Sequence, residues 1–126
     1  LKPDYGFIKT PSAQSIGQTD DPAIAKKNYT SLANQLSSVG INCDFAPVVD
    51  LAINPDNYVI VGLERSYGRF PEKVIRYARI FYDALHNEGI ISVLKHFPGH
   101  GSSTGDSHKG FVDVTNTWNM IELEPY

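Results

Sequence analysis

The sequence predicts an α/β fold in which helices cover a small sheet of parallel strands. Its predicted segments follow one another as helix, strand, loop, helix, strand and loop. Both predicted strands are mostly apolar, which is typical of parallel strands that are buried on both faces. The connection between them should be right-handed. In such folds the site lies at the carboxyl ends of the strands, where the polar loop 95–108 begins.

Composition limits the class of protein and its partners. The chain has 126 residues, of which 41% are apolar and 20% are charged, as in a globular domain with its own core. The net charge is −3 and no lysine or arginine cluster occurs, so we expect neither nucleic acid nor a membrane as partner. No apolar run approaches the roughly 20 residues that span a bilayer.

The N-terminus, Leu1 to Gly6, does not resemble a signal peptide and carries no initiator methionine. We therefore expect a processed chain or an excised piece. The single cysteine, Cys43, excludes an internal disulfide and a zinc site built on several thiolates. We expect Cys43 to be a small buried hydrophobe. One cysteine is compatible with the cytosol or with export, and the absence of a signal or spanning segment slightly favours the cytoplasm.

The first helix is predicted after a poorly patterned stretch, residues 1–20, which ends in a turn at 17–20. Asp21 is a favourable N-cap, Pro22 fits the first helical position, and Gly40 ends the helix. Apolar residues recur at helical spacing and should face inward. They are Ile24, Ala25, Leu32, Ala33, Leu36 and Val39.

A strand is predicted over Ile41–Val49, ending at Asp50, and a second strand over Ile90–Lys95. Between them a second helix runs from about Pro71 to Glu88, with Gly89 as its end. Its inward stripe consists of Val74, Ile75, Ala78, Phe81, Tyr82 and Leu85. An open two-stranded sheet leaves unpaired edges, so we expect another copy or the remainder of a larger sheet to pair with it.

Two further segments carry weaker signals. Arg65 lies beside Glu64 and could pair with it or with Asp50, or could face a ligand; the local pattern favours the structural pairing. Beyond the loop, residues 110–114 are predicted to be extended, and residues 117–121 to form a short helix that Thr117 caps.

The loop 95–108 holds three of the four histidines, together with one lysine and one aspartate. Histidine and lysine are costly to bury, and Pro98, Gly99 and Gly101 prevent a helix or strand from continuing. Polar residues on a loop that leaves a rigid strand commonly form a functional site. Several interpretations of this loop compete.

A metal site is one interpretation. The loop contains four competent ligands, His96, His100, Asp106 and His108. Pro98 and Gly99 separate the first two histidines, however, so these do not share a helical face as in standard zinc motifs. A phosphate-binding loop is weaker still, because its glycines follow the lysine, whereas a P-loop has the reverse order.

Acid–base catalysis is another interpretation. Asp106 and His108 flank Ser107, so in an extended segment they point the same way. An aspartate beside a histidine holds one tautomer and stabilises the imidazolium. A serine nucleophile is disfavoured because the nucleophile-elbow sequence is absent. A loop held together by its own polar side chains remains open as the plain structural interpretation.

The motifs resemble glycoside hydrolase family 3, in its β-N-acetylhexosaminidase branch. The resemblance covers residues 6–126 and is carried by Lys95–Gly101 together with Asp106–His108. Further matches are Pro11–Ala13, Asp21–Pro22, Phe45–Asp50 and Arg65–Gly68. It implies a (β/α)8 TIM barrel, of which this single segment, 1–126, is the middle and supplies about two strand–helix units.

The resemblance also implies an activity, the removal of terminal β-linked N-acetylglucosamine with retention, on chitin- or peptidoglycan-derived saccharides. It makes His108 the acid/base and Asp106 its partner. Arg65, Lys95 and His96 would bind the hydroxyls of the sugar. Neither a metal nor a cofactor is implied.

The nucleophile of the family is an aspartate on a later barrel strand, and no aspartate here has that sequence context. We therefore expect the chain to be inactive alone, with the remainder of the barrel as the missing partner. The alternatives are a non-catalytic carbohydrate-binding or structural fragment and, less favoured, a metal-dependent hydrolase.

Overall fold

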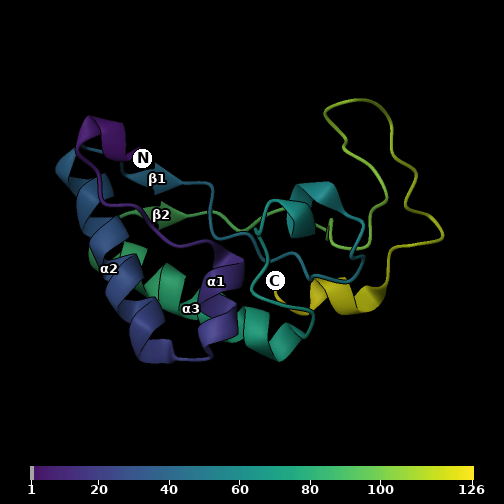
Figure 1. Cartoon of the computed structure of the whole chain (residues 1–126), viewed down its shortest axis with the longest axis horizontal. Helices are drawn as coiled ribbons and strands as arrows, with labels where there is room; N and C mark the ends of the chain where they lie inside the picture. The colour runs from purple at the N-terminus through teal and green to yellow at the C-terminus, as the bar shows by residue number, and fades with distance from the viewer. Residues whose placement is uncertain (1) are drawn as a thin grey trace.

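The computed structural model describes residues 2–126, which form a mixed α/β fold. Its elements are α1 (Ala13–Thr19), α2 (Pro22–Ser38), α3 (Pro71–Asn87), β1 (Cys43–Asp44), β2 (Ile91–Ser92) and the short helical turns η1 (Pro3–Tyr5), η2 (Tyr58–Gly62) and η3 (Met120–Leu123). The helices lie on one side of the strands, and a loop beyond residue 100 extends away from them before the C-terminus returns toward α3 (Figure 1). No helix of this described part is long and apolar enough to cross a membrane.

Helix α2 begins as the sequence predicts. The Asp21 carboxylate accepts hydrogen bonds from the backbone N–H groups of Ala23 (2.8 Å) and Ile24 (3.4 Å). The buried face consists of Ala25, Tyr29, Ala33 and Leu36. The expected burial of Ile24 and Val39 is wrong, since they are 41% and 52% exposed. Ile24 lies one position off the buried stripe, and Val39 follows the last helical turn.

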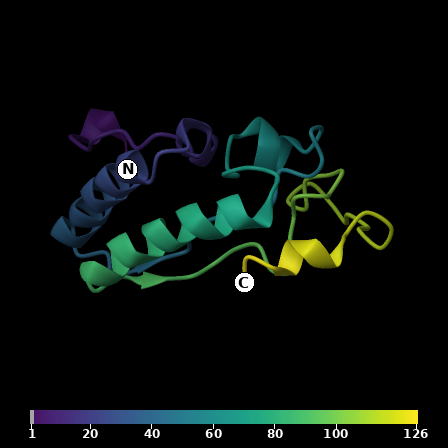
Figure 2. The same cartoon turned by 90° about the horizontal axis from the view of Figure 1, so that it is seen from below.

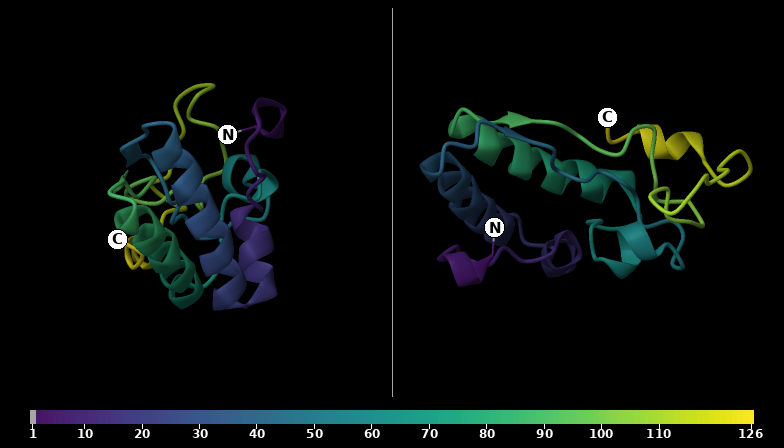
Figure 3. Two further views of the ribbon diagram at one scale, coloured as in Figure 1. Left: turned by 90° about the vertical axis from the view of Figure 1, so that its left-hand side faces the viewer. Right: turned by 90° about the horizontal axis from the view of Figure 1, so that it is seen from above.

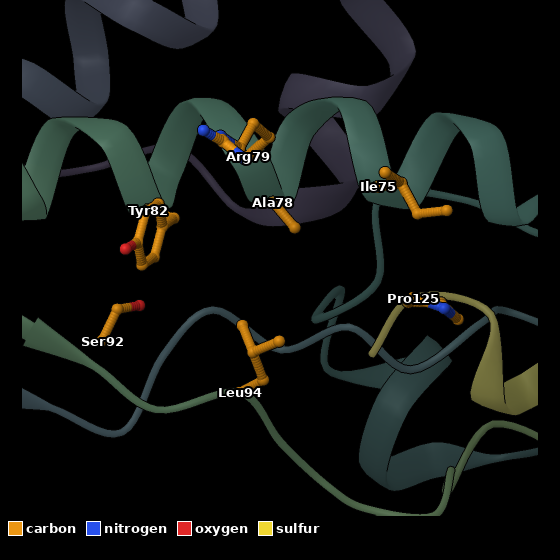
Figure 4. Close-up of a pocket in the computed structure, with 7 residues that line it drawn as sticks. All are labelled: Ile75, Ala78, Arg79, Tyr82, Ser92, Leu94 and Pro125. Atoms are coloured by element: carbon orange, nitrogen blue, oxygen red, sulfur yellow. The ribbon is translucent and has the colours of Figure 1, made fainter.

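Helix α3 packs beside α2 (Figure 2). Its inner face combines Pro71, Val74, Tyr77, Ala78, Phe81, Ala84 and Leu85. The expected burial of Ile75 and Tyr82 is wrong, because they are 42% and 38% exposed. They project instead into a groove of about 410 Å³ between α3 and the segment that contains β2 (Figure 4). The helix is therefore apolar on more of its circumference than the described elements cover.

The two strands are parallel, as predicted, and lie along α3 (Figure 3). They are much shorter than the predicted 41–49 and 90–95, since regular pairing covers two residues of each. The segments meet again where Val48 pairs with Lys95. Three residues separate β1 from Val48, but only two separate β2 from Lys95. The extra residue on the first segment acts as a bulge that interrupts the ladder.

The expected burial of Cys43 is also wrong, because its side chain is exposed. Successive side chains of a strand point to opposite faces, and in β1 the half-buried residue is Asp44. Cys43 therefore points to the face that no described element covers.

Several elements escaped prediction because they bury few apolar side chains. Helix α1 lies within the stretch expected to lack pattern, and its N-cap is Ser12, whose hydroxyl accepts from the Ser15 N–H (3.1 Å). The π-helical turn η2 follows Asn57. Residues 110–114 form no strand, and the last helical turn is capped by Asn119 rather than Thr117.

The core lies between the three α-helices and the extended chain that follows the strands. Its centre is aromatic: the Tyr29 ring packs edge-to-face on Phe81, with centroids 4.8 Å apart. The Tyr29 hydroxyl donates to the Tyr67 hydroxyl (3.0 Å), and burial raises the pKa of Tyr29 to about 12. This network fixes the helices that support the strand ends.

A buried carboxylate attaches η3 to the start of the polar loop. Glu122 is 1% exposed and accepts hydrogen bonds from the Ser102 hydroxyl (2.5 Å), the Ser102 N–H (3.2 Å) and the Asn119 N–H (3.3 Å). A Cβ atom on Gly99 would lie 2.6 Å from the Glu122 Cβ, so this approach requires glycine. The segment between Ser102 and Asn119 is therefore held at both of its ends by Glu122.

We predict that Glu122→Gln lowers the free energy of unfolding by about 1–3 kcal/mol, because an amide NH₂ group would face a buried N–H donor. Urea denaturation measures this change. Glu124→Gln, two residues away at an exposed position, is the control and should change stability by no more than about 0.5 kcal/mol. Equal stability of the two variants would show that Glu122 does not anchor the loop.

Candidate active site

A buried aspartate organises the end of the first strand segment. The Asp50 side chain is 0% exposed. Its Oδ2 atom lies 2.6 Å from His96 Nδ1, and its Oδ1 atom accepts from the N–H groups of His100 (2.7 Å) and His96 (3.3 Å). The carboxylate thus joins the ends of two neighbouring parallel segments, where the sequence places the site.

Arg65 completes this group from the other side of the His96 ring. Its Nη2 atom lies 3.2 Å from His96 Nε2, and its Nη1 atom donates to the Val59 carbonyl in η2 (3.3 Å). A guanidinium only donates, so Nε2 must accept and the ring proton is on Nδ1. The His96 ring therefore lies between the Asp50 carboxylate and the Arg65 guanidinium. The expected pairing of Arg65 with Glu64 or Asp50 is wrong: among residues 2–126 Arg65 forms no ion pair, and it reaches Asp50 only through this ring.

Asn57 and His100 support the same region, and the sequence alone does not identify either as a substrate-binding or catalytic residue. The Asn57 amide donates to the His100 carbonyl (2.7 Å), and its oxygen accepts from the Ile60 N–H (2.9 Å). Asp50 carried a usable signal in the sequence, because it ends an apolar strand. Asn57 carried none beyond a polar turn.

Gly101 allows the loop to cross the chain that follows Asp50. A Cβ atom at Gly101 would lie 1.8 Å from the Leu51 carbonyl oxygen, so only glycine fits. Asn54 holds the crossing in place, with its N–H bonded to the Gly101 carbonyl (3.1 Å) and its amide to the Ser103 carbonyl (3.0 Å). The first half of the loop is therefore fixed against the first strand segment.

The second half carries the predicted Asp106–His108 pair. His108 Nδ1 lies 2.9 Å from Asp106 Oδ1, and the same oxygen accepts from the His108 N–H (3.0 Å). The His108 side chain is 84% exposed. These hydrogen bonds lower the pKa of Asp106, and the backbone bond has a larger effect than the ring bond. Among the residues that the structure describes, Nε2 of His108 makes no hydrogen bond.

A cavity of about 280 Å³ lies between the two halves of the loop. It is lined by His96, Phe97, Pro98, Gly99, His100, Ser103, Ser107, Val112 and Val114. Ser107, the residue before His108, therefore lines the same cavity as His96. Its wall is mostly apolar with a few polar groups, as small-ligand sites usually are.

Lys95 lies apart from this group. Among residues 2–126 its ammonium makes no hydrogen bond or ion pair, and its charge acts on Asp44, where it opposes the pKa increase caused by burial. Within the same residues, no three histidine, cysteine, aspartate or glutamate side chains converge in a way that could hold a metal. His96 and His108 instead form separate pairs with Asp50 and Asp106.

Comparisons with known proteins give this geometry a context. Residues 6–126 match the glycosyl hydrolase family 3 N terminal domain. The chain is 39% identical over 118 residues to the beta-hexosaminidase LpqI of Mycobacterium tuberculosis, covering 92% of this chain and 30% of that protein. It is 42% identical over 113 residues to beta-hexosaminidase A of Pseudoalteromonas piscicida, covering 87% of this chain and 19% of that one.

Solved structures of related proteins also superpose on most of this chain. The structure of M. tuberculosis LpqI superposes with a TM-score of 0.80 at 39% identity, over 92% of this chain and 34% of that one. A family 3 β-N-acetylglucosaminidase from Paenibacillus superposes with a TM-score of 0.84 at 32% identity, over 95% of this chain and 23% of that one. The chain thus spans about a third of these relatives or less, and it belongs to glycosyl hydrolase family 3, matching part of the N-terminal domain of that family.

Proposed function

We propose that this chain supplies the acid/base arm and part of the sugar site of an enzyme that removes terminal β-linked N-acetylglucosamine with retention. The observation that carries the proposal is the hydrogen-bonded Asp106–His108 pair, whose solvent-facing nitrogen lies on a loop that borders the His96 cavity. The beta-hexosaminidase names of its relatives indicate the substrate class.

His108 is the acid/base in this proposal. Its imidazolium donates the Nε2 proton to the glycosidic oxygen as the bond to the sugar breaks and the nucleophile from outside this segment bonds to the anomeric carbon. The neutral ring then takes a proton from the water that displaces the nucleophile. Asp106 stabilises the imidazolium and holds the proton on Nδ1. The His–Asp pair replaces the carboxylic acid that retaining glycosidases usually employ.

Arg65 and His96 bind hydroxyl groups of the sugar, with His96 in the cavity wall and Arg65 behind its ring. Lys95 binds a sugar hydroxyl as well, once its ammonium turns from Asp44 toward the cavity. An exposed phenylalanine, Phe97 (73%), adds an apolar surface for the face of a sugar ring.

The proposal includes a (β/α)8 barrel, of which residues 1–126 form a middle segment. The groove along α3 supports it: Ile75, Tyr82 and Leu94 face an apolar space that a neighbouring strand–helix unit would fill (Figure 4). Ile91 in β2 is 65% exposed, as expected for a strand that lacks its neighbours. The nucleophile comes from outside this segment, and the segment alone should not hydrolyse the substrate.

A chimera tests the role of His108. The chain replaces the 118 matched residues of M. tuberculosis LpqI, and turnover of a chromogenic N-acetylglucosaminide is measured. We expect an active chimera in which His108→Ala lowers kcat about a hundredfold or more, because the leaving group loses its acid. The isolated chain should show no turnover.

His86→Ala in the chimera is the control, because His86 is an exposed histidine in the last turn of α3. It should leave kcat unchanged. Equal activity of the two alanine variants would contradict the role of His108, and robust turnover by the isolated chain would contradict the need for an external nucleophile. Binding of N-acetylglucosamine by a folded chimera that lacks turnover would favour a non-catalytic carbohydrate-binding role.

The charge state of Asp106 gives a pH prediction. Because the hydrogen bonds from His108 hold the pKa of Asp106 below its ordinary value of 3.8, its carboxylate should remain ionised throughout the neutral pH range. An NMR titration of the Asp106 carboxyl carbon checks this. In His108→Ala the ring bond is lost but the backbone bond stays, so the midpoint should rise only part of the way. A midpoint at or above the ordinary value in the unmodified chain would contradict the pairing.

A further inference from the structure

We propose that Asp50 is a positioning residue that fixes the proton of His96 on Nδ1, so that Nε2 accepts a hydrogen bond from a hydroxyl group of the ligand. The identity of that ligand as a sugar rests on the proposed function. The tautomer itself does not, because it follows from hydrogen bonds within the described chain.

The two oxygens of Asp50 have different tasks. Oδ1 accepts from the backbone N–H groups of His100 (2.7 Å) and His96 (3.3 Å), which are donors in any protonation state. Oδ2 is left for the ring and lies 2.6 Å from Nδ1. Since this carboxylate is buried and only accepts, the nitrogen that faces it must carry a proton.

The other nitrogen then has a single role. His96 Nε2 presents a lone pair, which Arg65 Nη2 occupies at 3.2 Å in this structure. A hydroxyl is the ligand group that suits this pair, because it donates to Nε2 and accepts from the guanidinium at once. An ether oxygen or a fluorine atom cannot donate, so a ligand modified in this way at the bound hydroxyl should bind about tenfold more weakly or worse.

Asp50→Asn reverses this arrangement with almost no change in shape. The two backbone N–H donors hold the asparagine oxygen, so its NH₂ group must face His96 Nδ1. A donor at that position requires Nδ1 to be unprotonated, which moves the ring proton to Nε2. The Nε2–H group then opposes the N–H groups of Arg65. The variant therefore changes the tautomer and also removes the acceptor for the ligand.

Long-range ¹H–¹⁵N correlation spectra of the ¹⁵N-labelled chain at neutral pH read the tautomer directly. In the unmodified chain we expect His96 with a protonated Nδ1 and an unprotonated Nε2. In Asp50→Asn we expect the opposite tautomer, with the proton on Nε2. Asp56→Asn, an exposed aspartate in the turn after the same strand segment, should leave the His96 spectrum unchanged. A protonated Nε2 in the unmodified chain overturns the proposal, so it stays falsifiable even if Asp50→Asn fails to fold.

Titration with N-acetylglucosamine separates this proposal from the proposed function. If both hold, the ring ¹⁵N chemical shifts of His96 change as the sugar is added. Asp50→Asn then weakens sugar binding about tenfold or more, whereas Asp56→Asn leaves it unchanged. The predicted tautomers without any sugar binding support the role of Asp50 and contradict the proposed ligand. Sugar binding that is equal in Asp50→Asn and in the unmodified chain contradicts the role of Asp50.

Discussion

The Asp50 carboxylate is the constraint on which the functional end of this chain depends. A buried charge is costly unless it is paired and hydrogen-bonded, and here the partners come from separate parts of the sequence. The ring of His96 arrives from the second strand segment, and the His100 N–H comes from the loop behind it. Arg65 supplies the opposite charge through His96, from the turn that follows η2. Satisfying one carboxylate therefore fixes the order and spacing of all these elements.

The polar loop divides into two parts with different physical character. Its first part is held by Asp50, by the close approach of Gly101 to the Leu51 carbonyl and by the bonds of Ser102 to buried Glu122. Its second part makes mainly local contacts and exposes His108 to solvent. In the proposed function, the rigid first part binds the sugar and the projecting second part carries the acid to the leaving group.

Sequence reasoning succeeded where local chemistry decides the structure. Asp21 as a cap, Pro71 as a helix start and the parallel direction of the strands all follow from short-range rules and appear in the structure. It failed where burial depends on distant neighbours: the strands are short because of a bulge, and the apolar side of α3 faces a groove. At the site, the Asp106–His108 contact was predictable from spacing, whereas the link between Asp50 and Arg65 through His96 requires the tertiary fold.

Two backbone amides provide the most direct test of whether the polar loop has a fixed first part and a projecting second part. Each belongs to a histidine that donates to an aspartate side chain. The His100 N–H bonds to buried Asp50, and the His108 N–H bonds to Asp106 on the projecting arm. Native-state hydrogen exchange should show the His100 amide protected to nearly the same degree as core amides of α3, with the His108 amide exchanging orders of magnitude faster. Equal, rapid exchange at both positions would contradict the claim that the Asp50 carboxylate fixes the site.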